Sequence, residues 1–268
     1  MAMFNWKQGL SYVLCTLMIG LLPARADVGM SDKVAKCFGK LDGTFVMRDT
    51  AGKTVCKFND ELASKAISPC STFKIVIGLI GLETGAIKDE NEIEKWDGVK
   101  HPVDTWNKDH NLKSAMSEYV NWYFQRVSAK IGEKELAKYL KLLHYGNENM
   151  SSGLDNFWMG ETGSLRITPT QQVEFLEQLY AEKLPLSARS QQIVKRMLKC
   201  DEGPNGVLFG KTGTDQRDGK LVSGWFVGFV ESKNGNYVFA THVDGPTGVT
   251  GAKAREISKK ILAELGDW

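Results

Sequence analysis

Histidine is scarce in this 268-residue chain, and the four that it has, His101, His110, His144 and His242, do not cluster. Neither their spacing nor that of the five cysteines resembles a metal-ligand set, so no metal site is predicted. A histidine-based catalytic triad is poorly supported for the same reason. If the chain carries a general base, that base must be a lysine or a carboxylate.

The sequence also lacks an excess of charge of either sign, with 34 Lys and Arg residues against 32 Asp and Glu residues. Domains that bind nucleic acid typically carry a basic surplus, so no nucleic-acid partner is expected. The content of 42% hydrophobic and 25% charged residues is that of an ordinary globular protein, and nothing indicates disorder.

No apolar run has the length typical of a membrane span, and the run from Leu10 to Leu22 is short for one. Lys7 precedes it, and Ala24 and Ala26 place small residues where a signal peptidase reads the chain. We interpret residues 1–26 as a signal peptide cleaved after Ala26, which predicts a periplasmic protein with no stable membrane anchor. A retained anchor is the competing interpretation. Without Lys7 and Arg25, 32 basic residues stand against 32 acidic ones.

Four cysteines follow the predicted signal peptide, namely Cys37, Cys56, Cys70 and Cys200. Export would expose them to oxidising conditions, and four cysteines allow three pairings. We favour a Cys37–Cys56 disulfide because these residues flank a predicted strand pair. Cys70 is expected to be a small buried hydrophobe.

Periodicity divides the chain into strands near both ends and helices between them. Residues 43–58 predict a hairpin, residues 71–85 a buried helix that ends at Gly85, and residues 112–198 a series of amphipathic helices. Strands at 207–214, 221–231 and 237–243 precede a helix at 252–265.

This order predicts an α/β (α+β) fold with an antiparallel sheet, flanked by N- and C-terminal helices, and an inserted all-helical subdomain. The predicted parts are 27–85 and 199–268, which together build the sheet, and 86–198, which is helical. We expect the functional cleft where the two meet. The glycine-rich loop at 146–166 is long for a compact domain, which favours a functional role.

Ser71 and Lys74 open the buried helix, and residues three apart share one helix face. No acid lies within four residues of Lys74. An ammonium without a partner in an apolar setting has a lowered pKa, so Lys74 could accept the proton of Ser71 and activate it as a nucleophile. The alternative is a capping serine beside a lysine whose head reaches the surface. This is the single S-x-x-K pattern in the chain.

A second local pattern is Lys211-Thr212-Gly213 within a predicted strand. A phosphate-binding P-loop is disfavoured, because Asn205 occupies the position of its first glycine and no helix is expected to follow the lysine. The other interpretation is a strand that presents Lys211 and Thr212 to a substrate carboxylate, as K-T-G does beside S-x-x-K in serine acyl-transfer enzymes.

Four motifs together resemble those of class D β-lactamases, the oxacillinase group of the penicillin-recognising serine enzymes. They are, in order, Ser71-Thr72-Phe73-Lys74, Tyr145-Gly146-Asn147, Phe157-Trp158 and Lys211-Thr212-Gly213. The likeness runs from about Gly43 to the C-terminus. Alone, the second motif could be a simple turn.

The resemblance implies a mechanism in which Ser71 attacks the lactam carbonyl and Lys74, carbamylated by carbon dioxide or bicarbonate, serves as general base; no other cofactor and no glutamate base are implied. Trp158 would hold the carbamate through its indole N–H. The amides of Ser71 and Thr214 would form the oxyanion hole.

Substrate recognition is also implied by the resemblance. Lys211, Thr212 and Gly213 would bind the β-lactam together with Tyr145 and Asn147. A cation near the last helix would assist with the substrate carboxylate. We choose Arg255 because its fork suits a carboxylate, although Lys253 fits nearly as well.

One position departs from the family pattern. Family members usually carry Ser-x-Val, whose serine relays protons, and here Tyr119 occupies that serine position. Tyr119 could relay a proton through its hydroxyl, Ser117 could do so after a local shift, or Tyr119 could only pack.

The resemblance leaves three functions open. The first is hydrolysis of penicillins by a monomer or homodimer, conferring β-lactam resistance. Residues 119–124 are similar to β-lactam sensor domains, which are acylated without turnover and normally follow membrane helices. A peptidoglycan DD-peptidase also uses S-x-x-K and K-T-G, but Tyr145-Gly146-Asn147 and Trp158 favour the β-lactamase.

Overall fold

The computed structural model describes residue 1 and residues 25–268. The helices are α1 (Arg25–Phe38), α2 (Asp60–Ala63), α3 (Lys74–Thr84), α4 (Leu112–Ser117), α5 (Asn121–Ile131), α6 (Glu133–Leu142), α7 (Pro169–Tyr180), α8 (Ala188–Met197) and α9 (Gly251–Glu264), with 3₁₀ turns η1 (Cys70–Phe73) and η2 (Asp104–Trp106). The strands are β1 (Asp42–Asp49), β2 (Thr54–Phe58), β3 (Lys199–Glu202), β4 (Gly206–Arg217), β5 (Lys220–Ser232) and β6 (Gly235–Asp244).

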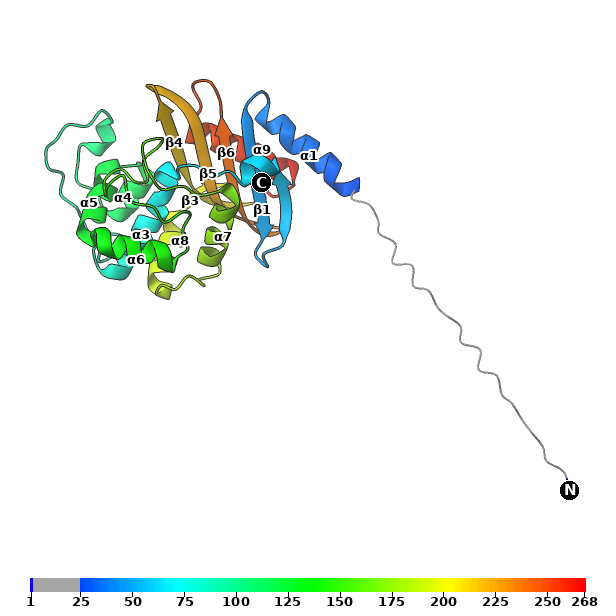
Figure 1. Ribbon diagram of the computed structural model, residues 1–268, viewed down its shortest axis with the longest axis horizontal. Helices are drawn as coiled ribbons and strands as arrows, with labels where there is room; N and C mark the ends of the chain where they lie inside the picture. The colour runs from blue at the N-terminus through cyan, green and yellow to red at the C-terminus, as the bar shows by residue number, and fades with distance from the viewer. Residues whose placement is uncertain (2–24) are drawn as a thin grey trace.

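The strands form one antiparallel sheet in the order β2-β1-β6-β5-β4-β3. At its centre, a strand from the N-terminal part of the chain pairs with one from the C-terminal part, because Asp42 of β1 is in register with Asp244 of β6. Figure 1 shows the sheet between α1 and α9 on one side and the helical part on the other. The predicted α+β fold, with its sheet built from both ends of the chain, is confirmed.

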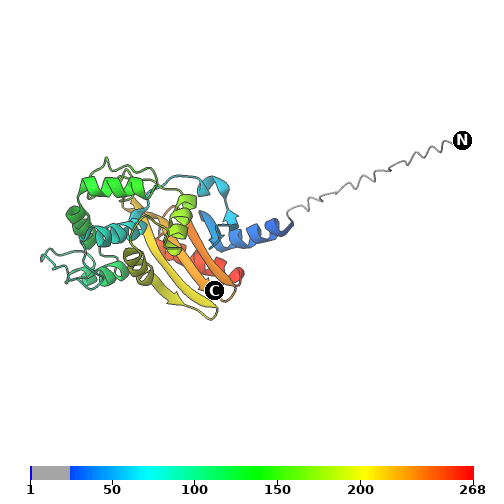
Figure 2. The same ribbon diagram turned by 90° about the horizontal axis from the view of Figure 1, so that it is seen from below.

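Both faces of the sheet are covered, which explains the unbroken apolar run in β5. Side chains alternate across a strand, so Phe226 joins the core beneath α1 and α9 while its neighbour Val227 joins the core on the helical side. The view from below in Figure 2 shows these two layers of helices with the strands between them. Helix α7, predicted within the helical subdomain, packs directly on β6 and β1.

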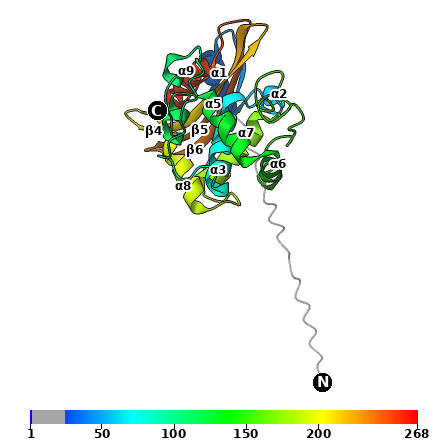
Figure 3. The same cartoon turned by 90° about the vertical axis from the view of Figure 1, so that its left-hand side faces the viewer.

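Helix α3 is the buried centre of the helical part. It packs against α5 and α8 and is buried from Lys74 to Leu82. Gly85 ends it in the left-handed region at φ 76°, as the sequence predicted. Figure 3 shows the molecule from this helical side. The helix positions its first turn, and with it the S-x-x-K residues, at the edge of the sheet.

Some expectations were incomplete or wrong. Strand β3 was not predicted, and neither were the bounds of helix α1, the N-terminal helix that the predicted fold includes. The predicted disulfide is wrong, because Cys37 carries a free thiol, which donates to the Lys33 carbonyl. The predicted signal peptide lies outside the described residues except for Met1, Arg25 and Ala26, and the last two begin α1. Within the described part, no helix has the length and hydropathy needed to cross a membrane.

Candidate active site

The nucleophile candidate lies on a tight turn that neighbouring segments hold in place. Ser71 belongs to η1, whose first residue, Cys70, has φ 47° in the left-handed region. The Thr72 hydroxyl donates to the Pro69 carbonyl at 2.7 Å, and the Trp225 indole donates to the Ser68 carbonyl at 2.9 Å. A serine on an over-determined turn at a helix start is the arrangement that a nucleophile requires.

Lys74 is fully buried, as the apolar helix predicted, but it is not without partners. Its Nζ donates to the Tyr119 carbonyl at 2.7 Å and to the Asn121 amide oxygen at 2.6 Å. Both acceptors are uncharged. Burial first, and the positive charge of Lys211 second, hold the pKa of Lys74 well below its usual value.

The two acceptors match the neutral form of this amine. A neutral amine has two N–H donors and one lone pair, whereas an ammonium has three donors. With both donors of Lys74 satisfied by Tyr119 and Asn121, the lone pair is left for a proton or an electrophile. Asn121 was not among the predicted site residues. Its place two residues after Tyr119, where the family pattern has valine, was the signal that could have identified it.

Trp158 provides an unusual buried donor next to this amine. Its side chain is fully buried, its ring centroid lies 6.0 Å from Lys74 Nζ, and its indole Nε1 has no hydrogen-bond partner among the described residues. A buried donor without an acceptor typically costs about 1–3 kcal/mol. A carbamate on Lys74 would add carboxylate oxygens beside the indole, so these residues fit that group.

Strand β4 lies against the nucleophile turn. A Cβ on Gly213 would come within 3.1 Å of the Pro69 carbonyl oxygen and 3.3 Å of Cys70 Cβ, so glycine permits this close approach. Gly213 was predicted to bind the β-lactam, and the structure shows that it also makes room for η1. Thr214 accepts a hydrogen bond from the Gly251 amide, which ties β4 to the start of α9.

Lys211 points from β4 into the protein interior. Its side chain is 2% exposed, and burial lowers its pKa to about 7. Lys211 Nζ donates to the Thr212 carbonyl at 3.0 Å and lies 4.1 Å from the centroid of the Tyr119 ring. The site therefore contains two buried lysines, and neither makes an ion pair within the described part of the chain.

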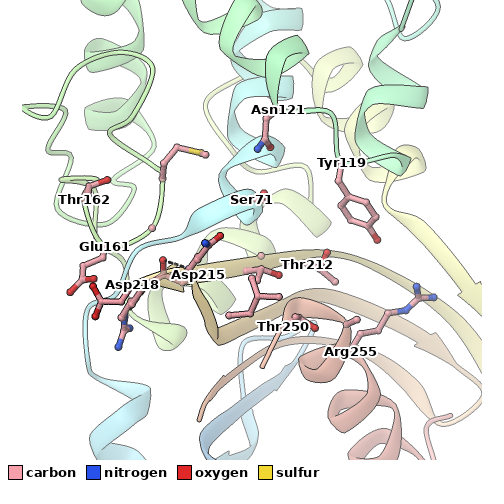
Figure 4. Close-up of a pocket in the computed structure, with 18 of the residues that line it drawn as sticks. Ser71, Tyr119, Asn121, Glu161, Thr162, Thr212, Asp215, Asp218, Thr250 and Arg255 are labelled. Atoms are coloured by element: carbon pink, nitrogen blue, oxygen red, sulfur yellow. Dashed lines mark hydrogen bonds and ion pairs between the residues drawn. The ribbon is translucent and has the colours of Figure 1, made fainter. Parts of the chain in front are cut away.

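These elements enclose a cavity of about 790 Å³ at the junction of the sheet and the helices. Its lining includes the predicted residues Ser71, Tyr119, Thr212, Gly213, Thr214 and Arg255. Figure 4 shows Ser71 near the centre of the view and Thr212 to its right, with Tyr119 above Thr212 and Arg255 below it. A cavity of this volume accommodates a drug-sized molecule.

Arg255 faces the pocket, and its alternative does not. The Arg255 guanidinium donates to the Cys200 carbonyl and pairs with Asp201 at 2.9 Å, which fixes its position beside the cavity. Lys253 pairs with Glu256 and is not part of the lining. The choice of Arg255 over Lys253 fits this geometry.

The structure does not bring Tyr145 or Asn147 to the pocket. Tyr145 is fully buried, where its ring packs against Phe73 and Phe175. The Asn147 amide donates to the Ser164 carbonyl and accepts from the Arg166 amide, which closes the base of the loop at 146–166. Both residues were predicted to bind substrate, and both instead support the turn and the loop that carries Trp158.

The hydroxyl groups of the two candidate relay residues, Tyr119 and Ser117, make no hydrogen bond to Lys74 or Lys211 in the described structure. The Tyr119 hydroxyl makes no hydrogen bond among the described residues, although the ring lines the pocket. Ser117 is exposed, and its hydroxyl donates to the Ser114 carbonyl within α4. The contribution of Tyr119 to the site comes from its carbonyl and its ring.

Comparison with known proteins identifies relatives over most of the chain. The family described as "Penicillin binding protein transpeptidase domain" matches residues 39–263. The probable β-lactamase YbxI of Bacillus subtilis is 43% identical over 229 residues, covering 85% of this chain and 83% of that protein. The crystal structure of a class D β-lactamase from Bacillus subtilis has 42% identity and a TM-score of 0.81, covering 87% of this chain and 95% of that one. The C-terminal domain of the Bacillus licheniformis BlaR penicillin-receptor has 35% identity and a TM-score of 0.82, covering 88% and 95%.

Proposed function

Because the chain belongs to the class D β-lactamases, serine hydrolases within the penicillin-binding transpeptidase family, we propose that it opens the β-lactam ring of penicillin-type antibiotics through an acyl-enzyme on Ser71. The observation that carries the proposal is the indole N–H of Trp158, which has no partner within residues 25–268 and lies beside the buried amine of Lys74. We also propose that this activity confers β-lactam resistance and that the protein acts in the periplasm.

The reaction has two parts. The Ser71 oxygen forms a bond to the lactam carbonyl carbon, its proton passes to the base, and the ring C–N bond breaks as the nitrogen takes a proton. Water then attacks the resulting ester, releases the ring-opened acid and restores the Ser71 hydroxyl. The amides of Ser71 and Thr214, both in the pocket lining, are proposed to stabilise the oxyanion in each part.

We propose that the base is Lys74 in its carbamylated form, N6-carboxylysine. A carbamate forms only from a neutral amine and then supplies a carboxylate that can take and return a proton. Burial favours the neutral amine of Lys74, and the two uncharged acceptors leave its lone pair available. Trp158 would donate to the carbamate and orient it.

We assign substrate orientation to the wall of the pocket that Thr212 and Arg255 form. Thr212 and Arg255 line it and would bind the carboxylate that penicillins carry. Arg255 keeps its pairing with Asp201, so it would approach the substrate with its position already fixed. Lys211, buried behind Thr212, adds positive charge to this wall when protonated.

A sensor function has one specific observation in its favour. The Asn121 amide oxygen accepts from Lys74 Nζ at 2.6 Å, and a carbamate nitrogen carries one N–H where the amine carries two, so carbamylation would break one of the two hydrogen bonds of Lys74. Without a carbamate the acyl-enzyme would persist. The relative with this fold that is named a penicillin-receptor makes acylation without turnover the second candidate.

Turnover of a chromogenic β-lactam, with and without bicarbonate, separates the two candidates. A β-lactamase hydrolyses many equivalents and gains rate with bicarbonate, whereas a sensor stops after one equivalent of acyl-enzyme. Ser71→Ala should abolish both outcomes. Ser117→Ala removes an exposed hydroxyl of the neighbouring helix and should leave both unchanged. One equivalent of acylation and no further product would refute the proposed hydrolysis.

A further inference from the structure

Tyr119 stands where the family pattern has a serine, and its ring makes a contact that a serine cannot make. Lys211 Nζ lies 4.1 Å from the ring centroid, well within the range in which an ammonium is attracted by an aromatic face. The tyrosine is 43% exposed at the pocket, and Lys211 is 2% exposed behind it. The ring therefore borders both the pocket and the lysine.

Lys211 has little else to hold its charge. Its one hydrogen bond among the described residues goes to the carbonyl of Thr212, the next residue in the chain. Lys74 lies near enough to repel it, and Cys200 of β3 is the neighbouring group that would favour its charged form. The Tyr119 face is thus, with the Thr212 carbonyl, one of two contacts that favour the ammonium over the neutral amine.

The backbone of Tyr119 fixes this ring in place. Its φ of 62° lies in the left-handed region, which is strained for a residue with a side chain. In that conformation the carbonyl accepts from Lys74 while the ring covers Lys211. The flanking loop is anchored, because the Trp106 indole donates to the Glu118 carbonyl and the Val120 amide donates to the Ala115 carbonyl. One residue contacts both buried lysines.

We propose that Tyr119 is a positioning residue that acts through its aromatic face, which holds the Lys211 ammonium in place for the substrate carboxylate. The proposal rests on the proposed function for its substrate, and it replaces the proton relay through the Tyr119 hydroxyl. Figure 4 shows the Tyr119 side chain extending into the pocket towards Thr212 and Arg255, the residues assigned to the same carboxylate.

Two variants separate the ring from the hydroxyl. Tyr119→Phe keeps the aromatic face and loses the hydroxyl. Tyr119→Leu keeps a large apolar side chain and the same left-handed strain but has no aromatic face. The reaction to follow is acylation of Ser71, measured by mass spectrometry, because it occurs in a β-lactamase and in a sensor alike. The substrates are a penicillin and its methyl ester, which lacks the carboxylate charge.

We expect Tyr119→Leu to need about tenfold more penicillin than the wild type for the same rate of acylation, because it binds the penicillin more weakly. The concentration of methyl ester that it needs should not change. The preference of the protein for the penicillin over its ester should therefore be smaller in this variant. Tyr119→Phe should match the wild type with both substrates. An unchanged acid-to-ester ratio in Tyr119→Leu would overturn the proposal. If Tyr119→Phe is not acylated by either substrate, the hydroxyl of Tyr119 acts as the proton relay, and the proposal is overturned as well.

A titration that needs no reaction provides the second measurement. With ¹³C-labelled lysine, NMR reports the Lys211 ammonium directly, and the loss of the aromatic face should lower its pKa by about one unit in Tyr119→Leu and not in Tyr119→Phe. Lys74 and Cys200 are present in all three proteins, so their influence cancels. If the wild type is not acylated at all, the proposed function fails, and this titration still decides the role of Tyr119.

Discussion

Replacement of Trp158 by phenylalanine tests the carbamate directly. The indole N–H of Trp158 is buried and has no partner in the part of the chain that the structure describes, so in the unmodified protein its removal breaks no hydrogen bond there. In the carbamylated protein the same donor would bond to an anion. Hydrogen bonds to charged groups contribute about 1.5–3 kcal/mol, which corresponds to carbon dioxide capture that is about 10- to 150-fold weaker in the variant.

The assay is the initial rate of β-lactam hydrolysis as a function of bicarbonate. We expect Trp158→Phe to need about 10- to 150-fold more bicarbonate for half its maximal rate. Carbamate formation is followed independently by ¹³C NMR with labelled bicarbonate. Trp122→Phe is the matched control, because Trp122 is also buried but its indole already donates to the Trp106 carbonyl.

The two variants also differ in stability. Without carbon dioxide, Trp122→Phe loses an existing hydrogen bond and should lower the Tm more than Trp158→Phe does. An unchanged bicarbonate requirement in Trp158→Phe, with the ¹³C carbamate signal at full strength, would refute the role assigned to the indole.

Three further predictions follow from the described contacts. Lys74→Met should abolish hydrolysis, and the Tm of the variant relative to the wild type should fall as the pH rises from neutral towards the usual lysine pKa. Burial lowers the pKa of Lys74, so the unfolded wild-type chain binds a proton that the folded one does not, and this cost to the wild type disappears as the pH rises. A Tm difference that does not change with pH would contradict this. Gly213→Ala should slow acylation by about tenfold or more, because the new Cβ would press on Pro69. Gly78→Ala is the control and should acylate at the wild-type rate, because its Cβ would have no neighbour closer than 3.6 Å. Equal acylation rates of the two variants in stopped-flow measurements would contradict this. Cys37→Ser should change the free energy of unfolding by less than about 0.5 kcal/mol, and a reducing agent should not change the Tm of the wild type. A larger loss of stability in the variant, or a lower Tm of the wild type under reducing conditions, would mean that Cys37 forms a disulfide.

The sequence was most informative where a local pattern determines burial. The apolar run after Ser71 predicted a buried helix that ends at Gly85, and burial of that helix placed Lys74 in the interior. The hairpin at β1 and β2 and the strands β4 to β6 were predicted from their alternation and turn residues. Strand β3 has four residues with three of them charged, so no apolar pattern marked it.

Contacts made by distant segments could not be predicted in this way. Lys74 meets the Tyr119 carbonyl and the Asn121 amide because a loop 45 residues away reaches the first turn of α3. Tyr145 was expected at the substrate because its motif was treated as a binding motif, but its ring completes an aromatic cluster in the core. A motif shows that a residue is needed without showing whether it touches a ligand or supports a residue that does.

The pairing of β1 with β6 also determines when activity can arise during folding. The pocket combines Ser71 with Thr212 and Arg255, so its two halves are separated by more than half of the chain. Contacts this distant in sequence close large loops and form late relative to local helices. The nucleophile turn gains its neighbouring strand only after the C-terminal strands have been synthesised and have joined β1. A covalent label on Ser71 therefore counts chains that have completed the sheet, and it can serve as a direct probe of folding yield.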